Sequence, residues 1–133
     1  MKKAIILFLF VFTAGWAGAQ LNISTKLRQD AVWDGLSEDW EVLSTDESVT
    51  FFEFNKDFTL FKHTTPTITS TYQILNWDYN DSLVRYTMNV RSDVGNEYEM
   101  IIDAMENCVA FFFWRNDDYI LVRHTIKDSW IKE

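Results

Sequence analysis

Residues 83–103 read LVRYTMNVRSDVGNEYEMIID, and apolar and polar side chains alternate through most of this stretch. A period of two places successive side chains on opposite faces of an extended strand. The alternation of residues 83–91 resumes at residues 97–103, and residues 92–96, which include Gly95, supply turn-forming side chains between them. The stretch therefore predicts two antiparallel strands, each with one apolar and one solvated face.

The same alternation predicts further strands along the chain. The spacing is roughly eleven residues per strand, which is typical of a β-sandwich or barrel and too short for crossover helices. The predicted strands are 40–45, 49–55, 58–65, 68–75, 83–91, 97–103, 108–114 and 119–126. We therefore predict an all-β fold, a single antiparallel up-and-down meander or barrel of about eight strands, closed or nearly closed.

The first 19 residues have the pattern of a secretory signal peptide. Lys2 and Lys3 precede an apolar run, and small residues end at Ala19. The apolar run is shorter than the ~20 residues that a transmembrane helix needs, although a retained signal anchor is the alternative. We expect cleavage of residues 1–19 and a secreted or periplasmic product that begins at Gln20, with no integral membrane segment after cleavage.

Residues 20–39 are expected to form an N-terminal segment with a short helix. Ile23, Leu27 and Ala31 lie four residues apart, which is typical of one helical face, and Asp34-Gly35 is expected to end the helix. Residues 40–133 then form the β domain.

Composition limits the class of partner. The formal net charge is −8, and Lys2 and Lys3 fall in the predicted signal, so the expected mature chain is more acidic still. Nucleic-acid and anionic-membrane binding rely on basic side chains, so neither is expected. Cys108 is the only cysteine, so no internal disulfide can form, and its apolar neighbours predict a buried, inert thiol.

Catalytic motifs are absent or incomplete. His63 and His124 are the only histidines, whereas a transition-metal site usually needs three or four ligands. His124 alternates with apolar residues, which favours a structural role in or beside the core. Glu97 and Glu99 lie about 7 Å apart along a strand, a separation seen in glycosidases, but a solvated acidic face is the favoured interpretation. We expect no enzyme activity, no catalytic residue, no metal and no cofactor; a glycan hydrolase is an alternative.

Part of the chain resembles a known group of proteins. Trp40 precedes the segment TFFEFNKDFT, residues 50–59, in which a strand, a tight turn and a strand carry an F-x-F-x-x-D pattern. A threonine-rich strand ending at Ile74 follows. Over about residues 40–126 the chain resembles small exported bacterial lipocalin-like domains, a calycin-type group. The resemblance implies a β-barrel; where that group usually has glycine after the turn aspartate, this chain has Phe58.

A ligand-binding function follows from the expected barrel. The interior of an eight-stranded barrel is filled by side chains or holds one small ligand. We therefore expect a non-enzymatic binding domain for a small apolar or amphipathic molecule, with a filled interior as the alternative. The expected lining residues are Phe52, Phe54, Tyr72, Tyr86, Met88, Tyr98, Met100, Phe112 and His124.

The segment 108–114 is apolar on both faces of its predicted strand. Either another segment of the chain packs over its second face, or that face meets a protein partner. The alternative function is therefore an envelope protein-interaction or inhibitor module that uses an outer aromatic surface. Trp77 and Tyr79, in the predicted turn 76–81, are the expected surface-recognition residues.

Overall fold

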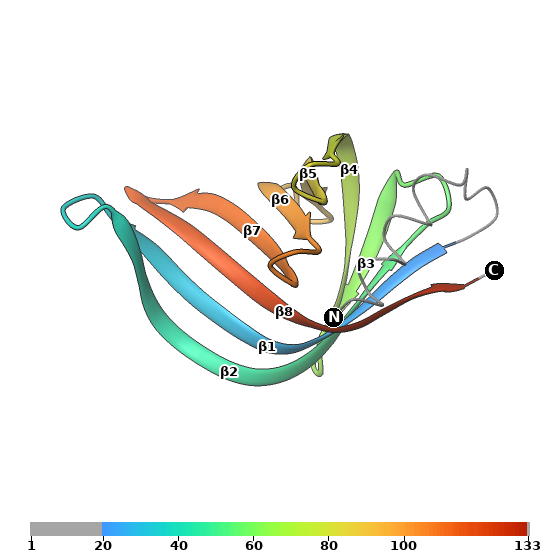
Figure 1. Ribbon diagram of the computed structural model, residues 1–133, viewed down its shortest axis with the longest axis horizontal. Helices are drawn as coiled ribbons and strands as arrows, with labels where there is room; N and C mark the ends of the chain where they lie inside the picture. The colour runs from blue at the N-terminus through green and yellow to red at the C-terminus, as the bar shows by residue number, and fades with distance from the viewer. Residues whose placement is uncertain (1–19, 133) are drawn as a thin grey trace.

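The computed structural model describes residues 20–132, which form one closed barrel of eight antiparallel strands (Figure 1). Each strand pairs with its neighbours in chain order, and β8 pairs with β1 to close the barrel. The strands are β1 Gln20–Asp34, β2 Asp39–Phe54, β3 Leu60–Thr64, β4 Thr69–Asn80, β5 Arg85–Ser92, β6 Glu97–Asp103, β7 Cys108–Arg115 and β8 Asp118–Lys132. The predicted all-β meander is confirmed; the predicted signal peptide, residues 1–19, lies outside the described residues.

The predicted N-terminal helix is wrong, because residues 20–34 form strand β1. β1 pairs with β2 along one edge and with β8 along the other, so it is an integral wall of the barrel. A spacing of four residues keeps side chains on one face of a strand as well as on one face of a helix. The spacing of Ile23, Leu27 and Ala31 therefore did not distinguish the two structures.

β2 joins two strands that were predicted separately, 40–45 and 49–55. The predicted strands left a gap at residues 46–48. In the structure seven consecutive residues of β2, 41–47, are exposed on both faces, so polar side chains there do not interrupt the strand.

The predicted turn 76–81 is also wrong, because β4 continues to Asn80. A register shift between Ile74 and Asn76 changes the phase of the alternation, and the later residues stay paired with β5. Trp77 and Tyr79 therefore lie in a strand, where Trp77 is 46% exposed and Tyr79 is partly buried against the core.

One end of the barrel is packed with side chains. This closed end carries the turns 55–59, 81–84 and 104–107, and it buries inward-facing residues from most of the strands. Its largest fully buried side chains include Phe52, Phe54, Phe58, Phe61, Tyr86, Met88, Met100 and Ile102. A fully buried side chain of this size contributes roughly 1.5–3 kcal/mol, so this end provides most of the stabilisation of the fold.

Phe58 lines the closed end from the turn between β2 and β3. Its φ is 55°, in the left-handed region that disfavours residues other than glycine. The ring is nevertheless buried, stacks on Phe54 at 5.1 Å between ring centroids and meets Trp77 edge-on at 5.5 Å. Phe58 therefore adopts a strained backbone conformation while its ring covers the end of the barrel.

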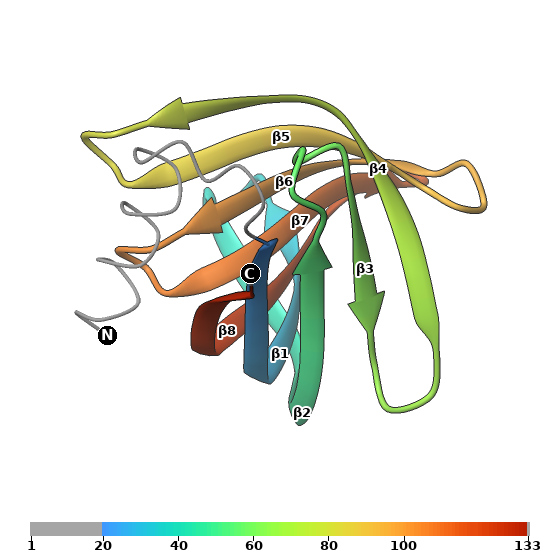
Figure 2. The ribbon, with the colours of Figure 1, turned by 90° about the vertical axis from the view of Figure 1, so that its right-hand side faces the viewer.

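The opposite end of the barrel is open and uneven. β2 has 16 residues, whereas its neighbour β3 has five, and their ladder joins only Phe51–Phe54 to Phe61–Thr64. β1, β2 and β8 curve onward together past this point, with the β1–β2 turn at their tip (Figure 1). Figure 2 shows the short β3 between β2 and β4.

We predict that Phe58→Gly is more stable than Phe58→Ala by about 1 kcal/mol, because both lose the ring but only glycine relieves the left-handed backbone. Both variants are expected to lose about 3 kcal/mol or more of unfolding free energy relative to the natural protein. Denaturant unfolding measures the difference. Lys56, whose φ is not positive, is the control position: there Lys56→Gly should be less stable than Lys56→Ala. If the glycine variant is the more stable one at both positions, the strain argument is contradicted.

Candidate functional site

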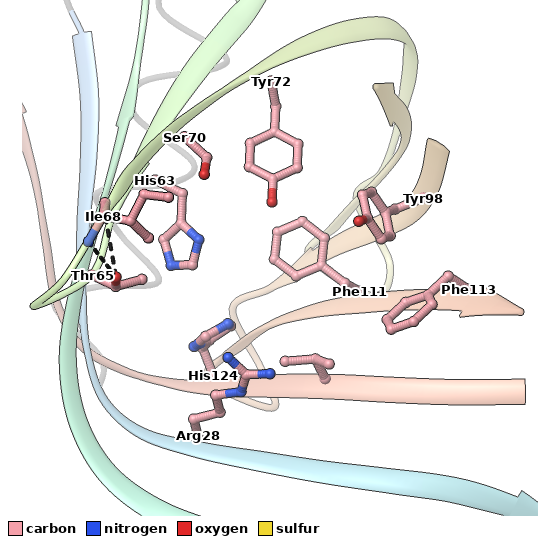
Figure 3. A pocket seen from close by; sticks show the side chains of 11 residues that line it. Arg28, His63, Thr65, Ile68, Ser70, Tyr72, Tyr98, Phe111, Phe113 and His124 are labelled. Atoms are coloured by element: carbon pink, nitrogen blue, oxygen red, sulfur yellow. Dashed lines mark hydrogen bonds between the residues drawn. The ribbon is translucent and has the colours of Figure 1, made fainter. Parts of the chain in front are cut away.

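A hollow of about 250 Å³ lies inside the open end of the barrel (Figure 3). Residues from six strands and from the β3–β4 turn surround it. The lining residues are Arg28, His63, Thr65, Ile68, Ser70, Tyr72, Tyr98, Phe111, Phe113, Val122 and His124. The interior is therefore filled at one end and hollow at the other.

Arg28 faces the hollow because of a bulge in β1. Thr25 is paired with Ile126 and Leu27 with Thr125, so Lys26 is an extra residue in the ladder with β8. A bulge reverses which positions of a strand face inward. Before the bulge, Thr25 points into the core. After the bulge, Arg28, which lies opposite His124, points inward.

The guanidinium of Arg28 is held by a neighbour on the same strand. Its Nε donates to Oδ1 of Asp30 at 2.7 Å and its Nη2 donates to Oδ2 at 3.2 Å. The two side chains are 42% and 32% exposed. This two-point contact fixes the plane of the guanidinium and leaves Nη1 outside the ion pair.

The two histidines meet across the floor of the hollow. Their ring centroids are 5.2 Å apart in an edge-on arrangement, and the His63 ring is stacked on Phe52 at 4.1 Å. Nε2 of His63 lies 3.2 Å from Oγ1 of Thr50, which lies 2.7 Å from Oγ1 of Thr25. Nδ1 of His124 is buried and has no hydrogen-bond partner among residues 20–132.

Both histidines are uncharged at neutral pH. Burial, together with the smaller effect of the positive charge of Arg28, lowers the pKa of His63 from 6.5 to about 4. Burial likewise lowers the pKa of His124 to about 3, with His63 and Arg28 adding to the effect and Asp30 opposing it. Arg28 is consequently the charged side chain that lines the hollow at neutral pH.

Aromatic side chains form the far wall. Tyr72 is stacked on Phe61 at 4.8 Å, and burial is the main cause of its raised pKa. Tyr98 meets Phe111 at 6.1 Å and Phe113 at 5.2 Å, both edge-on. In Figure 3 the rings of Tyr72, Tyr98 and Phe111 lie to one side of the two histidines and Arg28, and Phe111 is in ring contact with both imidazoles. One side of the hollow is therefore aromatic and the other is polar.

Only some of the expected lining residues meet in the hollow. Tyr72, Tyr98 and His124 line it. Phe112 does not point inward as expected: it lies on the outer face of β7, 6.0 Å from Trp40 and 6.1 Å from Tyr119. The remaining expected residues, which belong to the packed closed end, are Phe52, Phe54, Tyr86, Met88 and Met100.

Sequence reasoning missed Arg28, His63 and Phe111 as lining residues. Phe111 alternates with Val109 and Phe113. Val109 and Phe111 belong to the buried core, and Phe113 packs against it. Because both faces of residues 108–114 are apolar, periodicity alone did not reveal which face is internal. Arg28 was hidden by the bulge, for which the sequence carries no clear signal.

The outer face of the barrel carries its own aromatic cluster, which consists of Trp33, Trp40, Phe112, Trp114 and Tyr119. Trp40 contacts Trp33 at 5.3 Å, and Tyr119 contacts Trp114 at 4.9 Å. Trp114 is 69% exposed. Residues 20–132 therefore cover the second face of the apolar segment 108–114 only in part.

Glu97 and Glu99 lie on the outer wall, both exposed, beside a groove of about 430 Å³ that Trp114 and Tyr119 also line. Glu97 forms an ion pair with Arg91 at 3.1 Å. Cys108 is buried, as expected, and burial raises the pKa of its thiol. Within residues 20–132, no three or more His, Cys, Asp or Glu side chains come together as a metal site.

No protein-family model, curated protein or solved structure matches this chain. Between residues 20 and 132, no helix has the length and apolar character needed to span a membrane.

We predict that acid destabilises the protein through its two histidines. Between pH 6.5 and about 4 the unfolded chain binds protons that the folded imidazoles exclude, so stability is complete above pH 6.5 and falls with pH. The expected slope is about 2 kcal/mol per pH unit near pH 5. His63→Gln/His124→Gln should lose this slope in denaturant unfolding measured from pH 5 to 7; an equal slope in the double variant would refute the assignment.

Proposed function

We propose that this protein is an exported, non-enzymatic barrel of lipocalin-like type that binds one small amphipathic molecule in the hollow at its open end. The observation that carries the proposal is a barrel packed at one end and hollow at the other, with one guanidinium in the hollow. Export rests on Lys2, Lys3 and the apolar run behind them. The eight-stranded antiparallel barrel supports the lipocalin-like part of the proposal.

The size of the hollow limits the ligand. A cavity of roughly 150 Å³ holds a benzene molecule, and sites for drug-sized ligands are roughly 300–1,000 Å³. At about 250 Å³ the hollow suits a single aromatic ring with a short chain, or a medium-length alkyl chain. Long-chain lipids are too large to be enclosed.

The chemistry of the walls sets the orientation of the ligand. The rings of Tyr72, Tyr98 and Phe111 provide an apolar surface for the body of the molecule. Arg28 supplies hydrogen-bond donors, and the imidazoles carry no positive charge, so the ligand's polar group is an acceptor placed beside Arg28. A carboxylate satisfies this requirement better than a hydroxyl, because hydrogen bonds between charged groups are the stronger ones.

We expect octanoate and 3-phenylpropanoate to bind more tightly than octanol and 3-phenylpropanol, as measured by native mass spectrometry and calorimetry. Arg28→Met should lower the affinity for the carboxylates by about tenfold and leave the alcohols nearly unchanged. If the chain is expressed with residues 1–19, the mass should also show a product that begins at Gln20.

Ser70 and Thr71 offer a matched pair of controls for this experiment. Ser70 lines the hollow, and its neighbour Thr71 is exposed on the other face of β4. Ser70→Phe should abolish binding by filling the hollow, and Thr71→Phe should leave it intact. Equal affinity in Ser70→Phe and the natural protein, or no binding of any of the four compounds, would overturn the proposal.

A second candidate is the protein-interaction or inhibitor module, and the exposed outer aromatic cluster favours it. Trp114 and Trp33, two tryptophans of this cluster, are 69% and 41% exposed. Exposed aromatic side chains are enriched at protein interfaces. In this candidate the cluster, rather than the hollow, is the functional surface.

The oligomeric state tests this second candidate. If the cluster is an interface between copies, sedimentation equilibrium should show a dimer at micromolar concentration. Trp33→Ser/Trp114→Ser should then return it to a monomer with unchanged stability, because both rings are largely outside the core. If the natural protein is a monomer, the cluster is not an interface between copies of the chain.

A further inference from the structure

The N-terminal part of β2 has one hydrogen-bonding edge that pairs with no strand among residues 20–132. Residues 41–50 pair with β1 on one side, whereas the ladder to β3 on the other side begins only at Phe51. We call residues 41–50 the free edge. An unpaired strand edge presents a row of backbone N–H and C=O groups that can pair with another strand.

The free edge is exposed on its faces as well. Val42, Leu43 and Val49 are 53%, 56% and 48% exposed, so side chains on both sides of this strand lack cover. The stretch contains neither proline nor lysine, two residues that commonly protect strand edges from pairing. The edge is therefore able to accept a partner strand.

The charges of the free edge indicate what kind of strand fits. Glu41, Asp46 and Glu47 are exposed, and residues 41–50 contain no basic side chain. Arg28 lies opposite Asp46 in the ladder but is already paired with Asp30. Opposite charges on neighbouring strands stabilise pairing and like charges destabilise it.

We propose that the free edge binds an extended basic segment of another polypeptide, which adds a strand to the barrel wall beside β2. Backbone hydrogen bonds provide the affinity in this mode of recognition, and side chains provide the specificity. The partner segment combines lysine or arginine, which offset the acidic charge of the free edge, with strand-forming apolar side chains, which cover its exposed valines and leucine. This surface is separate from the hollow and does not depend on ligand binding there.

A second copy of the chain fits the edge less well than a flexible segment. Self-pairing brings the acidic residues of two free edges together. In addition, the β1–β2 register shifts between Val42 and Ser44 and again between Glu47 and Thr50, which bends the edge. An extended peptide can follow this bend, whereas the edge of a folded barrel cannot.

Three ten-residue peptides test the proposal on the chain that begins at Gln20. Alternating Val-Lys provides charge and a strand former, alternating Pro-Lys keeps the charge but cannot complete a ladder, and alternating Val-Glu reverses the charge. We expect saturable binding of the Val-Lys peptide only. Within residues 41–50, the amide groups that point toward the free edge should exchange at least tenfold more slowly at saturation, because they then donate hydrogen bonds to the peptide.

Two triple variants separate the free edge from the general acidity of the protein. Glu41→Gln/Asp46→Asn/Glu47→Gln should weaken binding of the Val-Lys peptide by about tenfold at low salt. Asp57→Asn/Asp81→Asn/Glu106→Gln removes the same charge from exposed turns at the closed end and should leave the affinity nearly unchanged. Ser70→Phe, which fills the hollow, should also leave it unchanged.

Three results would overturn the proposal. Equal binding of the Pro-Lys peptide would show attraction by charge without strand addition. Protection outside residues 41–50 would assign the peptide to another surface. A dimer whose residues 41–50 are protected without peptide would show that a second copy occupies the edge.

Discussion

The difference in length between β2 and β3 governs the architecture of this barrel. A strand of 16 residues lies beside one of five, so the wall closes over only part of its height. At the closed end, inward-facing side chains from all sides of the barrel pack against one another. Beyond it, toward the β1–β2 turn, the interior is open and one edge of β2 has no neighbouring strand among residues 20–132. The hollow and the free edge therefore have one origin, although they offer different chemistry to a ligand.

Much of the fold could be predicted from alternation, and the reason is visible in β5 and β6. Both strands have one buried and one solvated face, so periodicity determined their bounds to within two residues. β1 lacks this simple pattern, because the bulge at Lys26 exchanges its inward and outward positions. That exchange also concealed Arg28, the central polar residue of the candidate site. Phe112 was misplaced because both faces of β7 are apolar.

The open end contains groups that the core of a small domain usually avoids. Burying an imidazole favours its neutral form, and Nδ1 of His124 lacks a partner among the described residues. A nearby guanidinium makes protonation of either ring still less favourable. None of these features stabilises the fold, so they indicate a role for the hollow other than stability.

Phe58 strengthens the packing of the closed end. Its left-handed backbone is unfavourable by roughly 1–2 kcal/mol, yet its ring completes the aromatic packing of Phe54 and Trp77. A glycine at this turn would remove the strain and open the closed end, giving a barrel weakly packed at both ends. Since native stability is small, a hollow with buried histidines at one end requires dense packing at the other. The unusual residue at the turn is therefore consistent with a binding cavity at the opposite end.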